Sequence, residues 1–115
     1  MSDYLLDGAT LLAAMAAPFR LRSEAHAVLV DRSNRIFVSA ATFLDAYELE
    51  QDNRAAFPAL RGRLQSAATQ LGFLALDTTP THVDRAATLA AALPWPRRIL
   101  RAQAEMLPAT LLTLE

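Results

Sequence analysis

Three acidic residues lie where apolar runs of the chain end or pass into helical patterns. Asp7 directly follows the first apolar run, Asp45 lies in the early turns of the helical pattern after the second, and Glu115 ends the chain after the last. In an open α/β sheet, ligand sites collect at the carboxyl ends of the strands, because loops and helix N-termini converge there. The three carboxylates therefore predict an acidic ligand site at one edge of a sheet.

The apolar pattern alternates between short runs typical of strands and longer runs typical of helices. Ser23 and Thr79 precede helical runs as N-cap candidates, and Gly72 follows one as a C-cap candidate. The order predicts an α/β fold with a central parallel sheet of about four strands, flanked by helices in three layers. The predicted strands span residues 4–6, 36–39, 73–76 and 110–114, and the predicted helices span residues 9–17, 23–31, 42–54, 57–71, 80–93 and 97–106.

The length and composition indicate one domain, residues 1–115. A chain of this size can bury a substantial core but is too short for two typical domains. No apolar run approaches the roughly 20 residues of a membrane helix, and the start lacks the order of a signal peptide. The absence of cysteine excludes disulfides and thiolate metal sites. We therefore expect a cytoplasmic protein that does not contact a membrane.

The formal net charge of -1 provides no global attraction to nucleic acid. All 11 basic residues are arginine. Arginine is suited to bidentate phosphate contacts, but these arginines are scattered along the chain, and genome bias is the simpler explanation. Any contact with a polyanion would have to be local.

Five short motifs occur in an order that resembles PIN domains, and most closely the VapC-type ribonuclease toxins of bacterial toxin–antitoxin pairs. The resemblance extends over nearly the whole chain, which ends where most family members continue with another helix and strand. The motifs are Tyr4-Leu5-Leu6-Asp7, Phe37-Val38-Ser39-Ala40-Ala41 with Asp45, Leu71-Gly72-Phe73, Ala102-Gln103-Ala104 and Leu112-Thr113-Leu114-Glu115.

The resemblance implies a ribonuclease that depends on Mg²⁺ or Mn²⁺. It assigns catalytic roles to Asp7, Asp45 and Glu115, with Asp7 and Asp45 as metal ligands. Hard divalent cations prefer oxygen ligands, and a metal-bound water is a stronger nucleophile than free water. Asp45 replaces the usual glutamate of the family and Glu115 the usual aspartate, while Gly8-Ala9 stands where Thr-Asn is common.

One departure from the family pattern affects the expected chemistry. The family motif that normally supplies a further carboxylate corresponds to Pro94-Trp95-Pro96-Arg97-Arg98, so that Arg97 replaces the acid and Arg98 follows it. A positive charge about 4–6 Å from the acids disfavours a divalent cation. We expect Arg97 to form an ion pair with Asp7 or Asp45 in the position of the metal. The alternative is a clamp on RNA phosphate near a helix N-terminus.

Each candidate residue also has a structural interpretation. Asp7 could serve as a helix N-cap, Asp45 as an exposed helix acid and Glu115 as a frayed terminal residue. Ser39, at a strand end, could bond to neighbouring backbone or orient a site acid. Arg98, like Arg97, falls near a predicted helix N-terminus, where a cation calls for a compensating anion, and both arginines belong to the alternative clamp on RNA phosphate.

The sequence is compatible with two classes of function. The favoured one is a catalytically degenerate PIN-like domain that acts as a binding or dimerisation module. The alternative is an active Mg²⁺- or Mn²⁺-dependent endoribonuclease toxin that cleaves single-stranded RNA. The resemblance implies an antitoxin-like protein or RNA as partner, and the apolar composition favours a homodimer.

Overall fold

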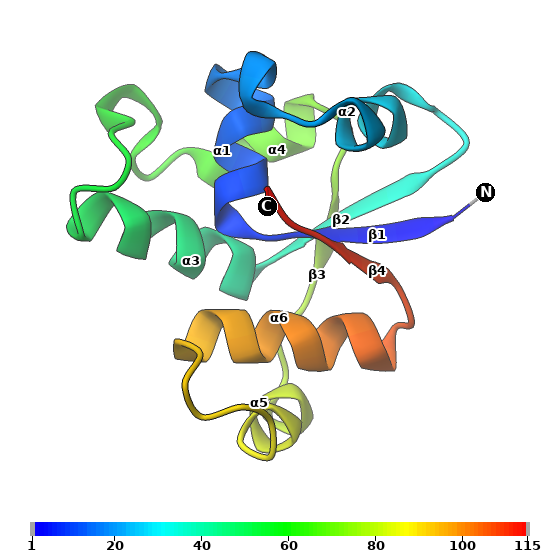
Figure 1. Ribbon diagram of the computed structural model, residues 1–115, viewed down its shortest axis with the longest axis vertical. Helices are drawn as coiled ribbons and strands as arrows, with labels where there is room; N and C mark the ends of the chain where they lie inside the picture. Colours follow the sequence, from blue (N-terminus) through cyan, green and yellow to red (C-terminus); the bar gives the residue numbers. More distant parts are fainter. Residues whose placement is uncertain (1, 115) are drawn as a thin grey trace.

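The computed structural model describes residues 2–114. These residues form an α/β fold in which four strands alternate with helices (Figure 1). Along the chain the elements are β1 (Asp3–Leu6), α1 (Gly8–Ala16), the 3₁₀ turn η1 (Pro18–Arg20), α2 (Ser23–Val30), β2 (Arg35–Ser39), α3 (Ala40–Gln51), η2 (Pro58–Leu60), α4 (Leu64–Gln70), β3 (Leu74–Leu76), α5 (Pro80–Ala86), α6 (Trp95–Met106) and β4 (Thr110–Leu112).

The four strands form one parallel sheet in the order β3-β2-β1-β4. Helices α1, α2 and α4 lie on one side of this sheet, and α5 and α6 lie on the other, which gives three layers (Figure 1). The predicted α/β class with four parallel strands is therefore confirmed. Because β2, β1 and β4 are neighbours that run in the same direction, their carboxyl ends meet at one edge.

Alternating side chains of the two central strands supply the two faces of the core, as the pleat of a strand requires. Leu5 and Phe37 belong to the cluster that packs against α5 and α6. Leu6, Ile36 and Val38 belong to the cluster under α1, α2 and α4. A strand with apolar residues on both faces explains the continuous apolar runs of the sequence.

Helix α3 leaves β2 without a loop and is fixed at its first turn. The Ser39 hydroxyl accepts hydrogen bonds from the backbone N–H groups of Ala41 and Thr42, at 3.1 and 3.4 Å. The Thr42 hydroxyl accepts the Ser39 N–H and donates to the carbonyl of Leu6 at 2.8 Å. This capping box therefore ties the start of α3 to the end of β1.

Two predicted helices were too long at their C-terminal ends. The helix predicted over residues 42–54 ends at Gln51, because Asn53 adopts a positive φ of 58° and the Arg54 N–H returns to the Leu49 carbonyl at 2.8 Å. This is the geometry of a Schellman turn. The helix predicted over residues 80–93 ends at Ala86, where the Thr88 hydroxyl donates to the carbonyl of Arg85.

The helix predicted over residues 57–71 is split into η2 and α4. Gly62 lies between them with a φ of 78°, which a helix cannot accommodate, and its N–H donates to the Tyr47 hydroxyl at 2.7 Å. Gly72 follows α4 with a φ of 83°, as predicted for a C-cap glycine. Thr79 caps α5 as expected, whereas Ser23 is the first residue of α2 and makes no capping hydrogen bond.

The helices in residues 2–114 have at most 12 residues, a length reached by α3 and α6. None of them has the length and apolar character needed to cross a membrane.

Candidate functional site

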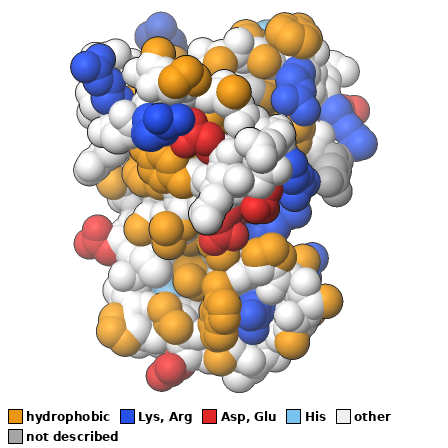
Figure 2. Space-filling view, turned by 90° about the vertical axis from the view of Figure 1, so that its left-hand side faces the viewer, with side chains coloured by type: hydrophobic (Ala, Val, Ile, Leu, Met, Phe, Trp, Pro, Cys, Tyr) orange, Lys and Arg blue, Asp and Glu red, His pale blue; other side chains and the backbone are white. Residues whose placement is uncertain are grey.

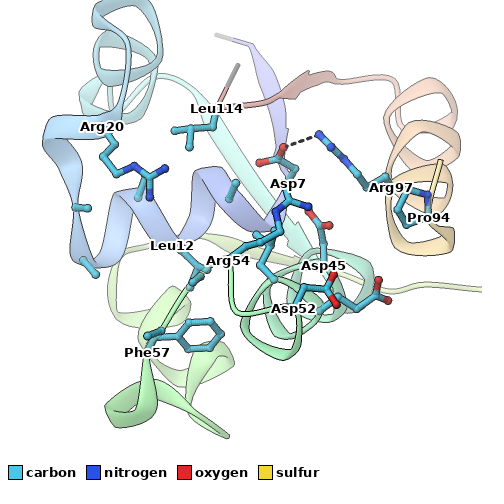
Figure 3. A pocket seen from close by; sticks show the side chains of 18 residues that line it. Asp7, Leu12, Arg20, Asp45, Asp52, Arg54, Phe57, Pro94, Arg97 and Leu114 are labelled. Atoms are coloured by element: carbon cyan, nitrogen blue, oxygen red, sulfur yellow. Dashed lines mark hydrogen bonds and ion pairs between the residues drawn. The ribbon is translucent and has the colours of Figure 1, made fainter. Parts of the chain in front are cut away.

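A cleft of about 650 Å³ opens at the carboxyl edge of the sheet (Figure 3). Asp7 and Asp45 both line it, as the parallel topology led us to expect. In the space-filling view, acidic and arginine side chains meet near the middle of this face, bordered by hydrophobic side chains (Figure 2). The cleft is lined by Asp7, Ala9, Leu12, Ala13, Ala16, Ala17, Arg20, Asp45, Glu48, Leu49, Asp52, Arg54, Ala55, Ala56, Phe57, Pro94, Arg97 and Leu114.

Asp7 is buried at the junction between β1 and α1, with 2 % of its surface exposed. Its Oδ1 accepts the backbone N–H of Thr10 at 2.8 Å, which makes it the N-cap of α1. Its own N–H donates to the carbonyl of Leu112, and the Thr10 hydroxyl donates to the same carbonyl. Asp7 is therefore both a structural cap and a cleft-lining acid, which combines the two interpretations drawn from the sequence.

Asp45 projects from α3 toward the start of α1 and is also buried, with 8 % exposed. Its Oδ2 accepts the backbone N–H of Gly8 at 2.7 Å, although the two residues are 37 positions apart. This short bond to a carboxylate links α3 to the first residue of α1. Asp45 is therefore not the exposed helix acid of the structural interpretation.

Gly8 allows the backbones of α1 and α3 to approach each other closely. A Cβ atom at this position would lie 2.4 Å from the Ala46 nitrogen and 2.7 Å from the Asp45 carbonyl carbon. Both are backbone atoms, so neither can move aside without displacing the helix. The absence of a side chain at Gly8 is thus a condition for the Asp45 bond.

Burial raises the pKa of the Asp45 carboxyl above its ordinary range. The Gly8 N–H opposes this rise by stabilising the ionised form, and the negative charge of Asp7 reinforces it. The positive charges of Arg97 and Arg54 lower the pKa again, but the net direction remains upward.

Arg97 reaches the acids from the first turn of α6. Its Nη2 lies 3.4 Å from Asp7 Oδ2, so the predicted ion pair is present (Figure 3). The Asp7 side chain in this pair is 3 % exposed and that of Arg97 is 35 % exposed. Arg97 therefore places a partly shielded positive charge directly beside the more buried acid.

Arg54 is a second positive charge at the cleft. It follows the left-handed Asn53 that ends α3, and this turn directs its side chain back toward Asp7 and Asp45 (Figure 3). Its charge acts on the pKa of Asp45. No pattern in the sequence indicated Arg54 as a site residue, because the turn that redirects its side chain depends on a single left-handed asparagine, Asn53.

Two other predicted site residues lie apart from the cleft. The guanidinium of Arg98 stacks on the Trp95 ring, with Cζ 3.8 Å from the ring centroid, and its buried Nε has no hydrogen-bond partner in residues 2–114. Ser39 caps α3 and does not line the cleft. Its capping bonds support the structural interpretation of Ser39, and Arg98 contacts Trp95 rather than the acids of the cleft.

A divalent cation does not fit the described acids as they stand. Three of the four carboxylate oxygens of Asp7 and Asp45 already accept hydrogen bonds. A dication about 5 Å from the Arg97 guanidinium would be repelled by on the order of 7 kcal/mol at an effective dielectric constant of about 20. Residues 2–114 contain no group of three or more acidic, histidine or cysteine side chains arranged to hold a metal. Glu115, the third predicted acid, lies outside the described residues.

The residues that organise the site were only partly visible in the sequence. The Asp7-to-Thr10 and Ser39-to-Thr42 spacings are those of helix caps and could have identified the two threonines. The Thr42 bond to the Leu6 carbonyl spans 36 residues, and no local pattern encodes it.

Comparison of the chain with protein-family models, with curated proteins and with solved structures found no match.

Proposed function

We propose that this chain is a PIN-like domain related to toxin–antitoxin ribonucleases, in which the catalytic site is degenerate and the fold acts as a binding or dimerisation module. The observation that carries the proposal is the Asp7–Arg97 ion pair. Arg97 supplies beside Asp7 the positive charge that a metal ion would supply in an active relative.

The shape and charge of the cleft support a role in binding. One long wall is apolar and is formed largely by α1, and the opposite wall carries acids from α3 and its C-terminal turn. Such a surface suits a partner segment that offers both apolar and basic side chains. We therefore propose a small antitoxin-like protein as the partner, with a second copy of the chain as the competing occupant. The wall residues are Ala9, Leu12, Ala13 and Ala16 on one side and Asp45, Glu48 and Asp52 on the other.

The alternative proposal is an active endoribonuclease toxin that uses Mg²⁺ or Mn²⁺. Its support is that Asp7 and Asp45 converge on one cleft of ligand-binding size. In either case we propose a cytoplasmic location, since a chain without cysteine is suited to a reducing compartment.

An RNA cleavage assay separates the two proposals. Single-stranded RNA is incubated with the protein in Mg²⁺ or Mn²⁺, and Asp7→Asn serves as the matched variant because it preserves the size of the capping side chain. We expect no cleavage beyond that of Asp7→Asn. Metal-dependent cleavage by the wild type that Asp7→Asn abolishes would reject the degenerate site and establish the enzyme.

A further inference from the structure

A second cavity of about 200 Å³ lies on the other side of the Asp7–Arg97 ion pair, between α6 and the end of β4. Within residues 2–114, Asp7 and Arg97 are the two residues that line both cavities, so their ion pair forms the shared wall. The volume is below the roughly 300–1,000 Å³ of a typical small-molecule site, yet several times the roughly 30 Å³ occupied by one water. The smaller cavity therefore has room for one group of several atoms.

The two cavities have opposite charge. The larger cleft is lined by four acids and three arginines. The smaller cavity is lined by Arg97 and Arg101 against the single carboxylate of Asp7. Arg97 and Arg101 are four residues apart on α6 and therefore project from the same side of the helix. Two arginines and one carboxylate thus border this small space, which gives its lining an excess of one positive charge.

The hydrogen-bonding capacity of these two arginines is mostly unused. The other three ion pairs of the described residues are bidentate, with N···O distances of 2.6–3.0 Å. Arg97 makes one contact of 3.4 Å with Asp7, and Arg101 makes no hydrogen bond or ion pair in residues 2–114. A guanidinium has five N–H donors. Most of the donors of these two guanidinium groups are therefore available to a ligand.

We propose that the smaller cavity binds a phosphate group between the guanidinium groups of Arg97 and Arg101. A guanidinium fork binds a pair of phosphate oxygens in bidentate fashion. A tetrahedral phosphate has two such pairs and can engage both arginines, whereas a carboxylate has only one. Leu100 and Leu111 form apolar walls that limit water and strengthen the charged hydrogen bonds. This site does not depend on whether the larger cleft is catalytic.

Titration with inorganic phosphate tests the site. The wild type, Arg101→Gln and Arg32→Gln are compared by isothermal calorimetry and thermal melting, with sodium chloride added to keep the ionic strength constant. Arg32→Gln is the matched control, because Arg32 precedes the opposite, N-terminal end of β2 and lines neither cavity. We expect saturable binding and a raised melting midpoint in the wild type and the control. The loss of one charged donor pair should weaken the affinity of Arg101→Gln at least about tenfold.

Two results would overturn the proposal: no saturable effect of phosphate beyond that of chloride, or an unchanged affinity in Arg101→Gln. A parallel titration with a 5′-mononucleotide and a dinucleotide lacking a terminal phosphate identifies the source of the group. Tighter binding of the mononucleotide supports a terminal phosphate, and tighter binding of the dinucleotide supports a backbone phosphodiester. Because Arg101 does not line the larger cleft, failure here leaves the proposed function untouched.

Discussion

Replacement of Gly8 by alanine should separate the two helices that carry the acids. The added Cβ would meet the Ala46 nitrogen at 2.4 Å, and the atoms around it belong to the backbone of α3. The conflict can be relieved only by moving α1 away from α3. That movement stretches the 2.7 Å bond between the Gly8 N–H and Asp45 Oδ2.

The expected cost has two parts. Overpacking against a rigid neighbour costs about 1–3 kcal/mol, and the loss of a hydrogen bond to a buried charged group costs about 1.5–3 kcal/mol. Alanine recovers less than about 1 kcal/mol through its better helix propensity. We therefore expect Gly8→Ala to reduce the free energy of unfolding by about 3 kcal/mol, a large fraction of the stability of a typical domain.

Urea denaturation monitored by circular dichroism measures this loss. Gly62→Ala is the matched control, because Gly62 has a positive φ of 78° and open space where an added Cβ would lie. The control should lose only about 1–2 kcal/mol through backbone strain. If Gly8→Ala were within about 0.5 kcal/mol of the wild type, or less damaging than Gly62→Ala, the close approach of α1 and α3 would be refuted.

Two further predictions concern the acid and the cap of α3. The pKa of the Asp45 carboxyl is higher in the native state than its ordinary value of about 3.9 in the unfolded chain. Between these two pKa values the native state binds more protons than the unfolded state. The free energy of unfolding therefore declines as the pH rises from the ordinary aspartate value through the native pKa. Asp45→Asn should remove this decline and be at least as stable as the wild type at pH 7. Denaturation of both proteins between pH 4 and pH 8 measures the difference. A steeper decline of stability with pH in the variant would contradict the upward direction of the Asp45 pKa shift. Ser39→Ala should reduce the free energy of unfolding by about 1 kcal/mol through loss of the N-cap, and equal urea midpoints for this variant and the wild type would show that the cap is not stabilising.

The parallel sheet was predictable because the apolar patterns that indicate its strands lie within short segments of the sequence. The two central strands, β1 and β2, are short apolar runs with buried residues on both faces, and parallel order follows from the alternation with helices. The edge strand β3 was predicted as a buried run, but Leu74 is 42 % exposed, because no strand of residues 2–114 pairs with its outer edge. The convergence of Asp7 and Asp45 then follows from topology, since each acid lies near the carboxyl end of a neighbouring strand. The Asp7–Arg97 pair was reached by combining this topology with the resemblance of the motif around Arg97.

The remaining features depend on contacts between distant segments. The close approach at Gly8 exists only because α3 packs against α1, and the position of Arg54 depends on one left-handed residue, Asn53. The break between η2 and α4 at Gly62 also depends on a contact with another segment, because the Gly62 N–H donates to the Tyr47 hydroxyl of α3. Since a single glycine is tolerated in many helices, Gly62 alone did not predict the break. The periodicity of apolar residues does not indicate such contacts between segments that are distant in the sequence.

The most direct test of the proposed degenerate site is a thermal melting titration of the wild type and Arg97→Asp with Mn²⁺. Arg97→Asp replaces the positive charge beside Asp7 with a carboxylate, which introduces the acid that the proposed PIN-domain resemblance implies at this position. We predict no shift of the wild-type midpoint at millimolar Mn²⁺. For the variant, saturation at about 100 times the dissociation constant adds about 2.7 kcal/mol, a rise on the order of 10 °C. The double variant Asp7→Asn with Arg97→Asp should lose this response. A saturable Mn²⁺ shift in the wild type that Asp7→Asn abolishes would contradict the claim that Arg97 occupies the place of the metal.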